Sequence, residues 1–271
     1  MNTTHAITAP IYLSNLRLLS ASWLLLLILA SVRLFRLGLE REYLIASVRT
    51  VVQLFLVGTA LGFIFDHASV WLVLAVVALF VCVSAFTAVG RQHRKVPGLL
   101  LRMGAALTAS AALLTILVSA FVIQVSPWWT PQYLIPLAGM IVSNSMNAAA
   151  LAIERLRAEL DVRRGEVEEL LALGASARQA VDVPAKAALR AALRPNLNSM
   201  YVVGLVSIPG TMTGQILAGL PPGGAARYQI LVMFLWNAGA AATCALLVWL
   251  SYRRFFTDAL QLRSELLEAH T

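Results

Sequence analysis

The residues of this chain that could contact a polar solute lie inside long apolar segments. Spacings of three and four residues place one such group on a single helix face: Met140, Asn144, Asn147 and Leu151. An amide without a partner costs several kcal/mol in hydrocarbon, so these side chains should face the interior of a helix bundle or an aqueous path.

A second group of amide and thioether side chains follows between positions 198 and 215, and Gln53 adds another amide earlier in the chain. We predict that a translocation path is lined by Gln53, Met140, Asn144, Asn147, Asn198, Met200, Met212 and Gln215. Two other interpretations stay open. Intramembrane amides commonly form hydrogen bonds between helices, and the methionines can be apolar filler instead of soft metal ligands. No metal-ligand set is assigned.

The second group is interrupted by a proline and a glycine. The segment 207–211, with the sequence SIPGT, should break its helix, because proline removes a backbone hydrogen bond and glycine loosens the turn. Broken helices at membrane depth expose carbonyl groups or act as hinges. We predict a hinge at Pro209 and Gly210; the alternative is a structural kink.

The sequence contains no motif for enzymatic chemistry. Lys95 and Lys186 follow Arg94 and Ala185, so neither belongs to the Gly-Lys-Ser/Thr sequence of a phosphate-binding loop. There is no His-Glu-x-x-His zinc motif and no Gly-x-Ser-x-Gly nucleophile elbow. The apolar spans also lack the carboxylates and histidines that proton-driven carriers use. We expect a non-catalytic protein that binds no cofactor.

Composition predicts an all-α, polytopic membrane protein. Of 271 residues, 59% are hydrophobic and 13% charged, and the mean hydropathy is +0.78. A soluble domain of this size could not bury so much apolar surface. The net charge of +8 comes from basic residues that flank apolar spans, a pattern typical of topology signals and not of nucleic-acid binding. Cys82 and Cys244 lie within spans, where a disulfide is not expected.

About seven transmembrane helices are expected in a single transmembrane domain, residues 1–271. The predicted spans are residues 13–32, 43–65, 70–89, 103–125, 133–153, 197–218 and 228–250. The loops after the odd-numbered spans hold nearly all Lys and Arg, which puts the N-terminus outside and the C-terminus in the cytoplasm. Whether the second span crosses completely is the weakest point. The expected location is a bacterial inner membrane.

Residues 154–195, here called the elbow, form the longest polar segment and lie between the fifth and sixth spans. Their composition favours helix, with one interruption at Gly174. A helix, a bend and a second helix would make a compact cytoplasmic unit suited to docking a partner. Pro184 is expected to start or kink the second helix, and Asp182 can pair with Arg178 or Lys186.

Three blocks of the chain resemble a known family, the FetB-like (UPF0014) permeases. They are residues 139–147 (GMIVSNSMN) with 154–156 (ERL), residues 198–219 (NSMYVVGLVSIPGTMTGQILAG), and residues 227–230 (RYQI) with Met233 and Phe234. Members are described as membrane subunits of ABC transporters implicated in iron export. They resemble plant aluminium-tolerance half-transporters.

The resemblance implies that a separate ATPase subunit uses ATP and docks on the elbow, and that two copies of the chain pair. The elbow also resembles the coupling loop of ABC importers in its spacing from Glu168 to Gly174, although Leu170 and Leu171 depart from that pattern. The coupling residues expected are Glu168, Glu169, Gly174, Ala175 and Ser176.

The substrate implied by the resemblance is iron or another metal. A ferric ion prefers carboxylate oxygens, which these spans lack, so a chelated metal or a different solute stays open. Two other functions also stay open. One is a secondary carrier, and the other is a membrane scaffold or sensor that only recruits a cytoplasmic partner.

Overall fold

The computed structural model describes residues 14, 19–20, 22–92 and 96–267, and these residues form helices joined by short turns. Over that range no β-strand occurs, only two isolated bridges. The predicted helical class is therefore confirmed. The chain divides into two compact units. One contains residues 1–67 and 215–220, and the other contains residues 68–214 and 221–271.

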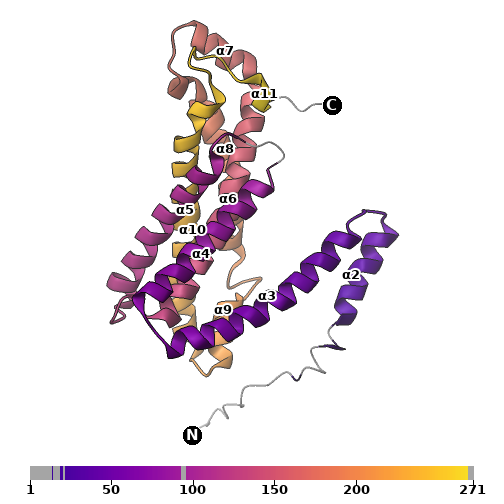
Figure 1. Ribbon diagram of the computed structural model, residues 1–271, viewed down its shortest axis with the longest axis vertical. Coiled ribbons are helices and arrows are strands. Elements are labelled where there is room, and N and C mark those ends of the chain that lie inside the picture. The colour runs from indigo at the N-terminus through magenta and orange to yellow at the C-terminus, as the bar shows by residue number, and fades with distance from the viewer. Residues whose placement is uncertain (1–13, 15–18, 21, 93–95, 268–271) are drawn as a thin grey trace. The chain divides into compact units, whose positions relative to one another are not determined.

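The first unit contains a hairpin of two helices, α2 (Ser22–Leu34) and α3 (Glu40–Asp66) (Figure 1). The chain turns between them at Gly38, whose φ of 69° suits a residue without a side chain. Part of the predicted span 13–32 lies outside the described residues. The 27 residues of α3 form one uninterrupted helix, long enough to cross a bilayer.

The second unit is built around α6 (Pro131–Val162). This helix contacts α4 (Val70–Gly90), α5 (Leu99–Leu117), α8 (Ala177–Val202) and α10 (Pro222–Ser251). Beyond these lie α7 (Arg164–Ala172), a 3-10 turn (Tyr252–Phe255) and α11 (Ser264–Leu267), at one end of the unit (Figure 1). After α5, the helix continues with π-helical bonding from Val118 to Ile123.

Within the part of the chain that the structure describes, five helical segments are long and apolar enough to cross a membrane: Glu40–Asp66, Val70–Gly90, Leu99–Ile123, Pro131–Val162 and Pro222–Phe255. They correspond to the second, third, fourth, fifth and seventh predicted spans. The first predicted span contributes the 13-residue helix α2. The sixth is divided between the end of α8 and α9 (Gly210–Leu217). The count of seven and the orientation stay predictions.

Small residues let the helices of the second unit approach closely. A Cβ atom added to Gly239 on α10 would lie 2.7 Å from Ile141 Cγ2 and 3.2 Å from Ser145 Oγ on α6. A Cβ added to Gly139 would lie 3.2 Å from the Phe80 ring on α4. Such contacts are the usual basis of helix association in lipid, where van der Waals packing replaces the hydrophobic effect.

Gly239→Ala should lower the free energy of unfolding by about 1–3 kcal/mol, because the added methyl group overlaps Ile141 and the two helices must separate. The measurement is denaturant unfolding of the purified protein in detergent. Gly104→Ala in α5 is the matched control, since a Cβ there meets no atom within 4 Å. Equal stability of both variants would contradict the close α6–α10 contact.

Candidate functional site

The amide of Asn144 joins α6 to α10. Its Nδ2 atom donates a hydrogen bond of 3.1 Å to the carbonyl oxygen of Trp236. One residue further along α10, Asn237 Nδ2 donates to the Met233 carbonyl over 2.7 Å. The indole Nε1 of Trp236 is enclosed and has no hydrogen-bond partner among the described residues. One amide therefore joins the two helices, and α10 carries a second amide and an unsatisfied donor directly beside that contact in sequence.

Asn147, one turn after Asn144, joins α6 to the end of α4. Its Oδ1 atom accepts a hydrogen bond of 3.2 Å from Arg91 Nη1. Gln92, the residue after Arg91, donates a hydrogen bond of 3.0 Å from its Nε2 atom to the carbonyl oxygen of Ala150 on α6. The predicted polar face of α6 thus binds its neighbours on both sides, while Met140 at its start is half-buried.

The end of α8 presents polar side chains outward. Asn198 and Ser199 are exposed and Met200 is half-buried. The hydroxyl of Ser199 donates to the carbonyl of Pro195 in its own helix, over 3.0 Å. Unlike Asn144, Asn198 is not enclosed by the helices of its own unit. In lipid such an exposed amide needs water or another protein chain beside it.

The helical backbone stops at Val202 and resumes at Gly210. Between them Gly204 adopts a φ of 84°, and its N–H donates to the Ser207 carbonyl over 2.9 Å. Leu205 is 90% exposed at the tip of this turn. The predicted break is present, but it begins about four residues before the predicted 207–211 segment. The left-handed glycine of the turn is Gly204, whereas Pro209 and Gly210, the predicted hinge, lie where α9 starts.

After the break, Thr211 donates a hydrogen bond to the side-chain oxygen of Gln229 on α10. Gln229 is buried, so this bond ties the start of α9 to the core of the second unit. Met212 is half-buried. The two remaining predicted path residues belong to the first unit, where Gln53 is exposed on α3 and Gln215 is half-buried near the end of α9.

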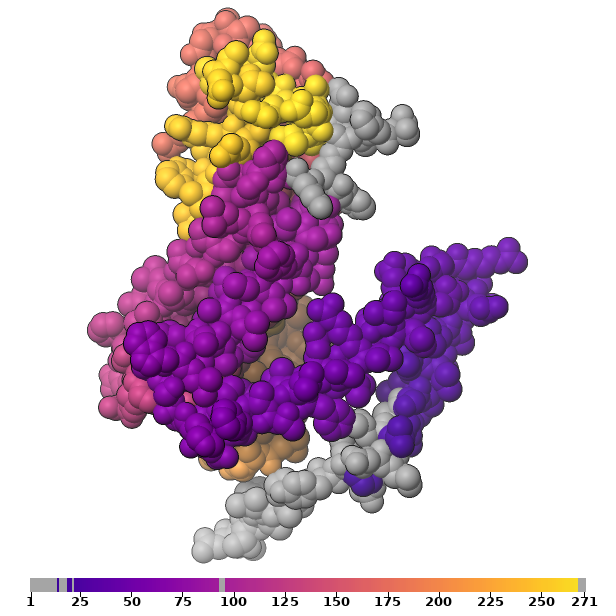
Figure 2. Space-filling view, viewed as in Figure 1, coloured from indigo at the N-terminus to yellow at the C-terminus, as the bar shows by residue number. Residues whose placement is uncertain are grey.

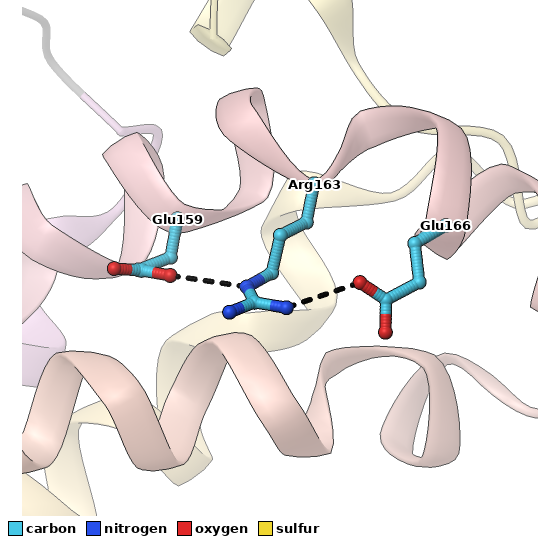
Figure 3. Close-up of polar contacts among 3 residues, drawn as sticks. All are labelled: Glu159, Arg163 and Glu166. Carbon is cyan, nitrogen blue, oxygen red and sulfur yellow. Dashed lines mark hydrogen bonds and ion pairs between the residues drawn. The ribbon is translucent and has the colours of Figure 1, made fainter.

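The elbow is formed by the end of α6, by α7 and by the start of α8. Arg163 stands between the first two helices and bridges them. Its Nε lies 3.2 Å from Glu159 and its Nη1 3.1 Å from Glu166 (Figure 3). Hydrogen bonds to Glu159 and then to Glu166 raise the pKa of the Arg163 guanidinium. The two carboxylates therefore orient α7 relative to α6.

The predicted bend lies at Gly174, whose φ is 89°. The next helix begins with a reciprocal cap, in which Ser176 Oγ accepts from the Gln179 N–H and the Gln179 side chain accepts from the Ser176 N–H. Pro184 lies inside α8 and does not start it, because this cap does. Asp182 pairs with Lys186 at 2.6 Å.

The predicted coupling residues lie together on this bend. Glu168 pairs with Arg164 at 2.8 Å, and Glu169 is exposed on the same helix. Ala175 is half-buried and Ser176 caps α8. Leu173, which was not among them, is 78% exposed at the end of α7.

No cluster of three or more metal-binding His, Cys, Asp or Glu side chains occurs in residues 14, 19–20, 22–92 and 96–267. The polar groups of the site are amides, hydroxyls, an indole and thioethers. These can hold a neutral or complexed solute by hydrogen bonds, but they do not make a cage for a bare hard cation.

Four residues of the site were not expected from the sequence: Arg91, Gly204, Trp236 and Asn237. Trp236 and Asn237 lie in the seventh predicted span. Tryptophan and asparagine are unusual together in the middle of an apolar helix, so this pair could have indicated a functional position. Arg91 resembled an ordinary flanking charge. The amide partners of α6 are remote in sequence, so no local pattern reveals them.

The chain matches known proteins over most of its length. The family described as "Uncharacterised protein family (UPF0014)" matches residues 15–256. A UPF0014 membrane protein of Synechocystis sp. is 39% identical over 243 residues, which is 89% of this chain and 94% of that protein. The probable iron export permease protein FetB of Escherichia coli is 33% identical, over 84% of this chain and 86% of that protein.

A plant relative is of similar length. The Arabidopsis thaliana protein called ALUMINUM SENSITIVE 3 is 37% identical over 84% of this chain and 82% of its own. No solved structure matches the chain. The relatives that are called membrane proteins and the five apolar helices together identify a multi-pass membrane protein. Its bacterial relatives fit the expected location in a bacterial inner membrane.

Asn144→Leu should lower the free energy of unfolding by about 0.6–2 kcal/mol, the range for hydrogen bonds between membrane helices, because the Trp236 carbonyl loses its donor. Asn198→Leu should leave stability unchanged, since Asn198 is exposed. Denaturant unfolding in detergent measures both. An unchanged midpoint for Asn144→Leu would show that the seam does not depend on this bond.

Proposed function

Because the chain belongs to the UPF0014 family, we propose that it is the membrane-spanning permease subunit of an ABC transporter. A separately encoded ATPase subunit hydrolyses ATP, and this chain provides the path. One relative is called a probable iron export permease, which suggests iron or another metal as the solute exported.

The observation that carries the proposal is the broken helix between α8 and α9. Residues 203–209 form an irregular turn within a long apolar segment, directly after the exposed Asn198 and Ser199. Lipid cannot satisfy the polar groups of such a turn, and irregular backbone is tolerated at membrane depth only where protein covers it or water reaches it. A protein that only anchored a partner would need no such segment.

A second copy of the chain supplies the other wall of the path in this proposal. Leu205 and Val206, which is 82% exposed, follow the polar end of α8 within a few residues. Exposed aliphatic side chains beside exposed amides are suited to a contact between protein chains, in which the aliphatic groups are buried and the amides stay wet. Asn144 and Asn147 then support this wall from within the unit, because their amides bind α10 and α4.

The donor set bears on the form of the substrate. Amides and hydroxyls bind the outside of a complex by hydrogen bonds, whereas a bare ferric ion requires carboxylate oxygens. Among the described residues no carboxylate cluster is present. We therefore expect the metal to cross as a complex with a small chelator.

In this proposal the ATPase subunit binds to the elbow. The Arg163 bridges join α6 to α7 (Figure 3), and the cap at Ser176 defines where α8 begins. A unit of this kind can transmit a nucleotide-dependent conformational change of the ATPase subunit to α6 and α8.

The test is affinity purification of the tagged, full-length protein in mild detergent, followed by identification and assay of any co-purifying ATPase. We expect a stoichiometric subunit with a phosphate-binding loop, whose ATPase activity rises with a chelated metal. Transport that survives ATP depletion but collapses with the proton gradient would instead establish a secondary carrier.

Asn198→Leu should lower ATP-driven export from proteoliposomes by about tenfold, which corresponds to a barrier increase of about 1.4 kcal/mol, because it removes an amide from the path wall. Thr87→Leu is the matched control. Thr87 is a half-buried polar residue within a span, and its hydroxyl bonds its own helix at Val83. Export equal to wild type in Asn198→Leu would remove this residue from the path.

A further inference from the structure

The C-terminal residues of the described chain fold back onto the elbow. Leu266 and Leu267 of α11 are buried, and α11 contacts α6. Phe256 and Leu262 pair across an antiparallel bridge, so the chain between them forms a closed loop. Figure 2 shows this segment in yellow beside the salmon atoms of the elbow, at one end of the second unit.

The loop of residues 257–261, here called the C-terminal loop, is held by its own hydrogen bonds. The Thr257 N–H donates to the Gln261 carbonyl over 2.8 Å, and the Gln261 N–H donates to Thr257 Oγ1 over 3.1 Å. The Leu260 N–H donates to the Thr257 carbonyl over 3.0 Å. These bonds fix the direction in which the loop presents Leu260.

Two grooves meet at Leu260. The larger has a volume of about 820 Å³ and lies between the start of α8 and the C-terminal loop; its lining includes Arg178, Trp249, Arg253 and Leu260. The smaller, of about 540 Å³, lies between α7 and the same loop, with Glu168, Leu171 and again Leu260 in its lining. Leu260 therefore lies between the two grooves and lines both of them, and elbow residues form the opposite wall of each.

The backbone of Leu260 has an unfavourable conformation. Its φ is 58°, a left-handed conformation that strains a residue with a β-carbon and that Gly or Asn adopts more readily. Its side chain is nevertheless 47% exposed. About half of the side chain packs within the chain, and the other half of this strained leucine is available for a contact with another molecule.

We expect this end of the unit to stand outside a bilayer, because every charged residue of α6 follows Ile153. The 32 residues of α6 span about 48 Å at 1.5 Å per residue, whereas the hydrocarbon core is about 30 Å thick. The last third of α6, α7 and the bend at Gly174 follow beyond that limit. An exposed leucine here, like Leu173 at the end of α7, faces water or a soluble partner, not lipid tails.

The charges of the larger groove indicate what kind of partner fits it. Within the described residues, no ion pair is formed by Arg178 or Arg253, and Arg253 donates only to the neighbouring Tyr252 hydroxyl, over 3.3 Å. Asp258 is the one carboxylate in the groove lining. A second copy of the chain that docked symmetrically through this face would bring the same arginines, so it would not balance this charge. A partner with aliphatic side chains beside a carboxylate would.

We propose that the C-terminal loop and the elbow residues that line the two grooves beside it form the docking surface for the ATPase subunit, with Leu260 inserted between apolar side chains of that subunit and Arg178 and Arg253 paired with its carboxylates. The inference rests on the proposed function. It extends the coupling surface from the bend at residues 168–176 to the C-terminal part of the chain, some 85 residues away in sequence.

The experiment measures binding of the ATPase subunit recovered in the co-purification, expressed and purified separately, to the full-length permease in detergent. Leu260→Asn keeps the left-handed loop, because Asn tolerates that conformation, and removes the apolar side chain. We expect the same thermal unfolding midpoint as wild type and affinity about tenfold weaker, a common cost of truncating a central apolar contact.

Val183→Asn is the matched control. Val183 is 45% exposed on α8 of the same elbow but belongs to neither groove lining. The variant should therefore bind the ATPase subunit with the affinity of wild type. Arg178→Gln should reduce the dependence of affinity on salt concentration, because one ion pair is lost.

The outcomes separate the two proposals. If the wild-type protein recovers no ATPase subunit, the proposed function fails and this inference fails with it. If wild type binds the subunit and Leu260→Asn binds it equally well, only the role of the C-terminal loop is refuted. Equal weakening by Val183→Asn and Leu260→Asn would also refute it, since the effect would not be specific to the grooves.

Discussion

A helix that is longer than the bilayer is thick organises the second unit. The 32 residues of α6 run without interruption from Pro131, at one end, to Val162 inside the elbow. Its face toward α10 is fixed by the contact at Gly239 and by the Asn144 amide, and its face toward α4 by Gly139 and Asn147. The polar elbow is therefore a continuation of the membrane core and not an appendage joined by a flexible linker.

The second constraint is that lipid satisfies no backbone hydrogen bonds. Most of the second unit obeys it through uninterrupted helices. Residues 203–209 do not, and the exposed amide of Asn198 precedes them by one helical turn. The two departures coincide in one place, which is why that place, and not the α6–α10 seam where the Asn144 amide is hydrogen-bonded, is the best candidate for contact with a solute.

The sequence predicts the apolar helices well, because hydrophobic length is a strong signal. The structure places α4 at Val70–Gly90, against a predicted span of 70–89. The bend at Gly174 was also predicted, since a single glycine interrupts a helical composition. The beginning of the break at Val203 was not, because Leu205 and Val206 resemble a continuing apolar span. The partners of Asn144 and Leu260 arise only from folding, since α10 and the elbow are remote from them in sequence.

The reciprocal cap at Ser176 and the break after Val202 mark the two ends of one helix, α8, of 26 residues. At 1.5 Å per residue that is a rod of about 39 Å, so a tilt of roughly 10° about the capped end carries the other end through about 7 Å. Asn198 and the turn at Gly204 lie at that far end. A small rotation imposed at the elbow would therefore give a displacement about as wide as a hydrated solute at the far end, provided that α8 moves as one body across Pro184 and Pro195.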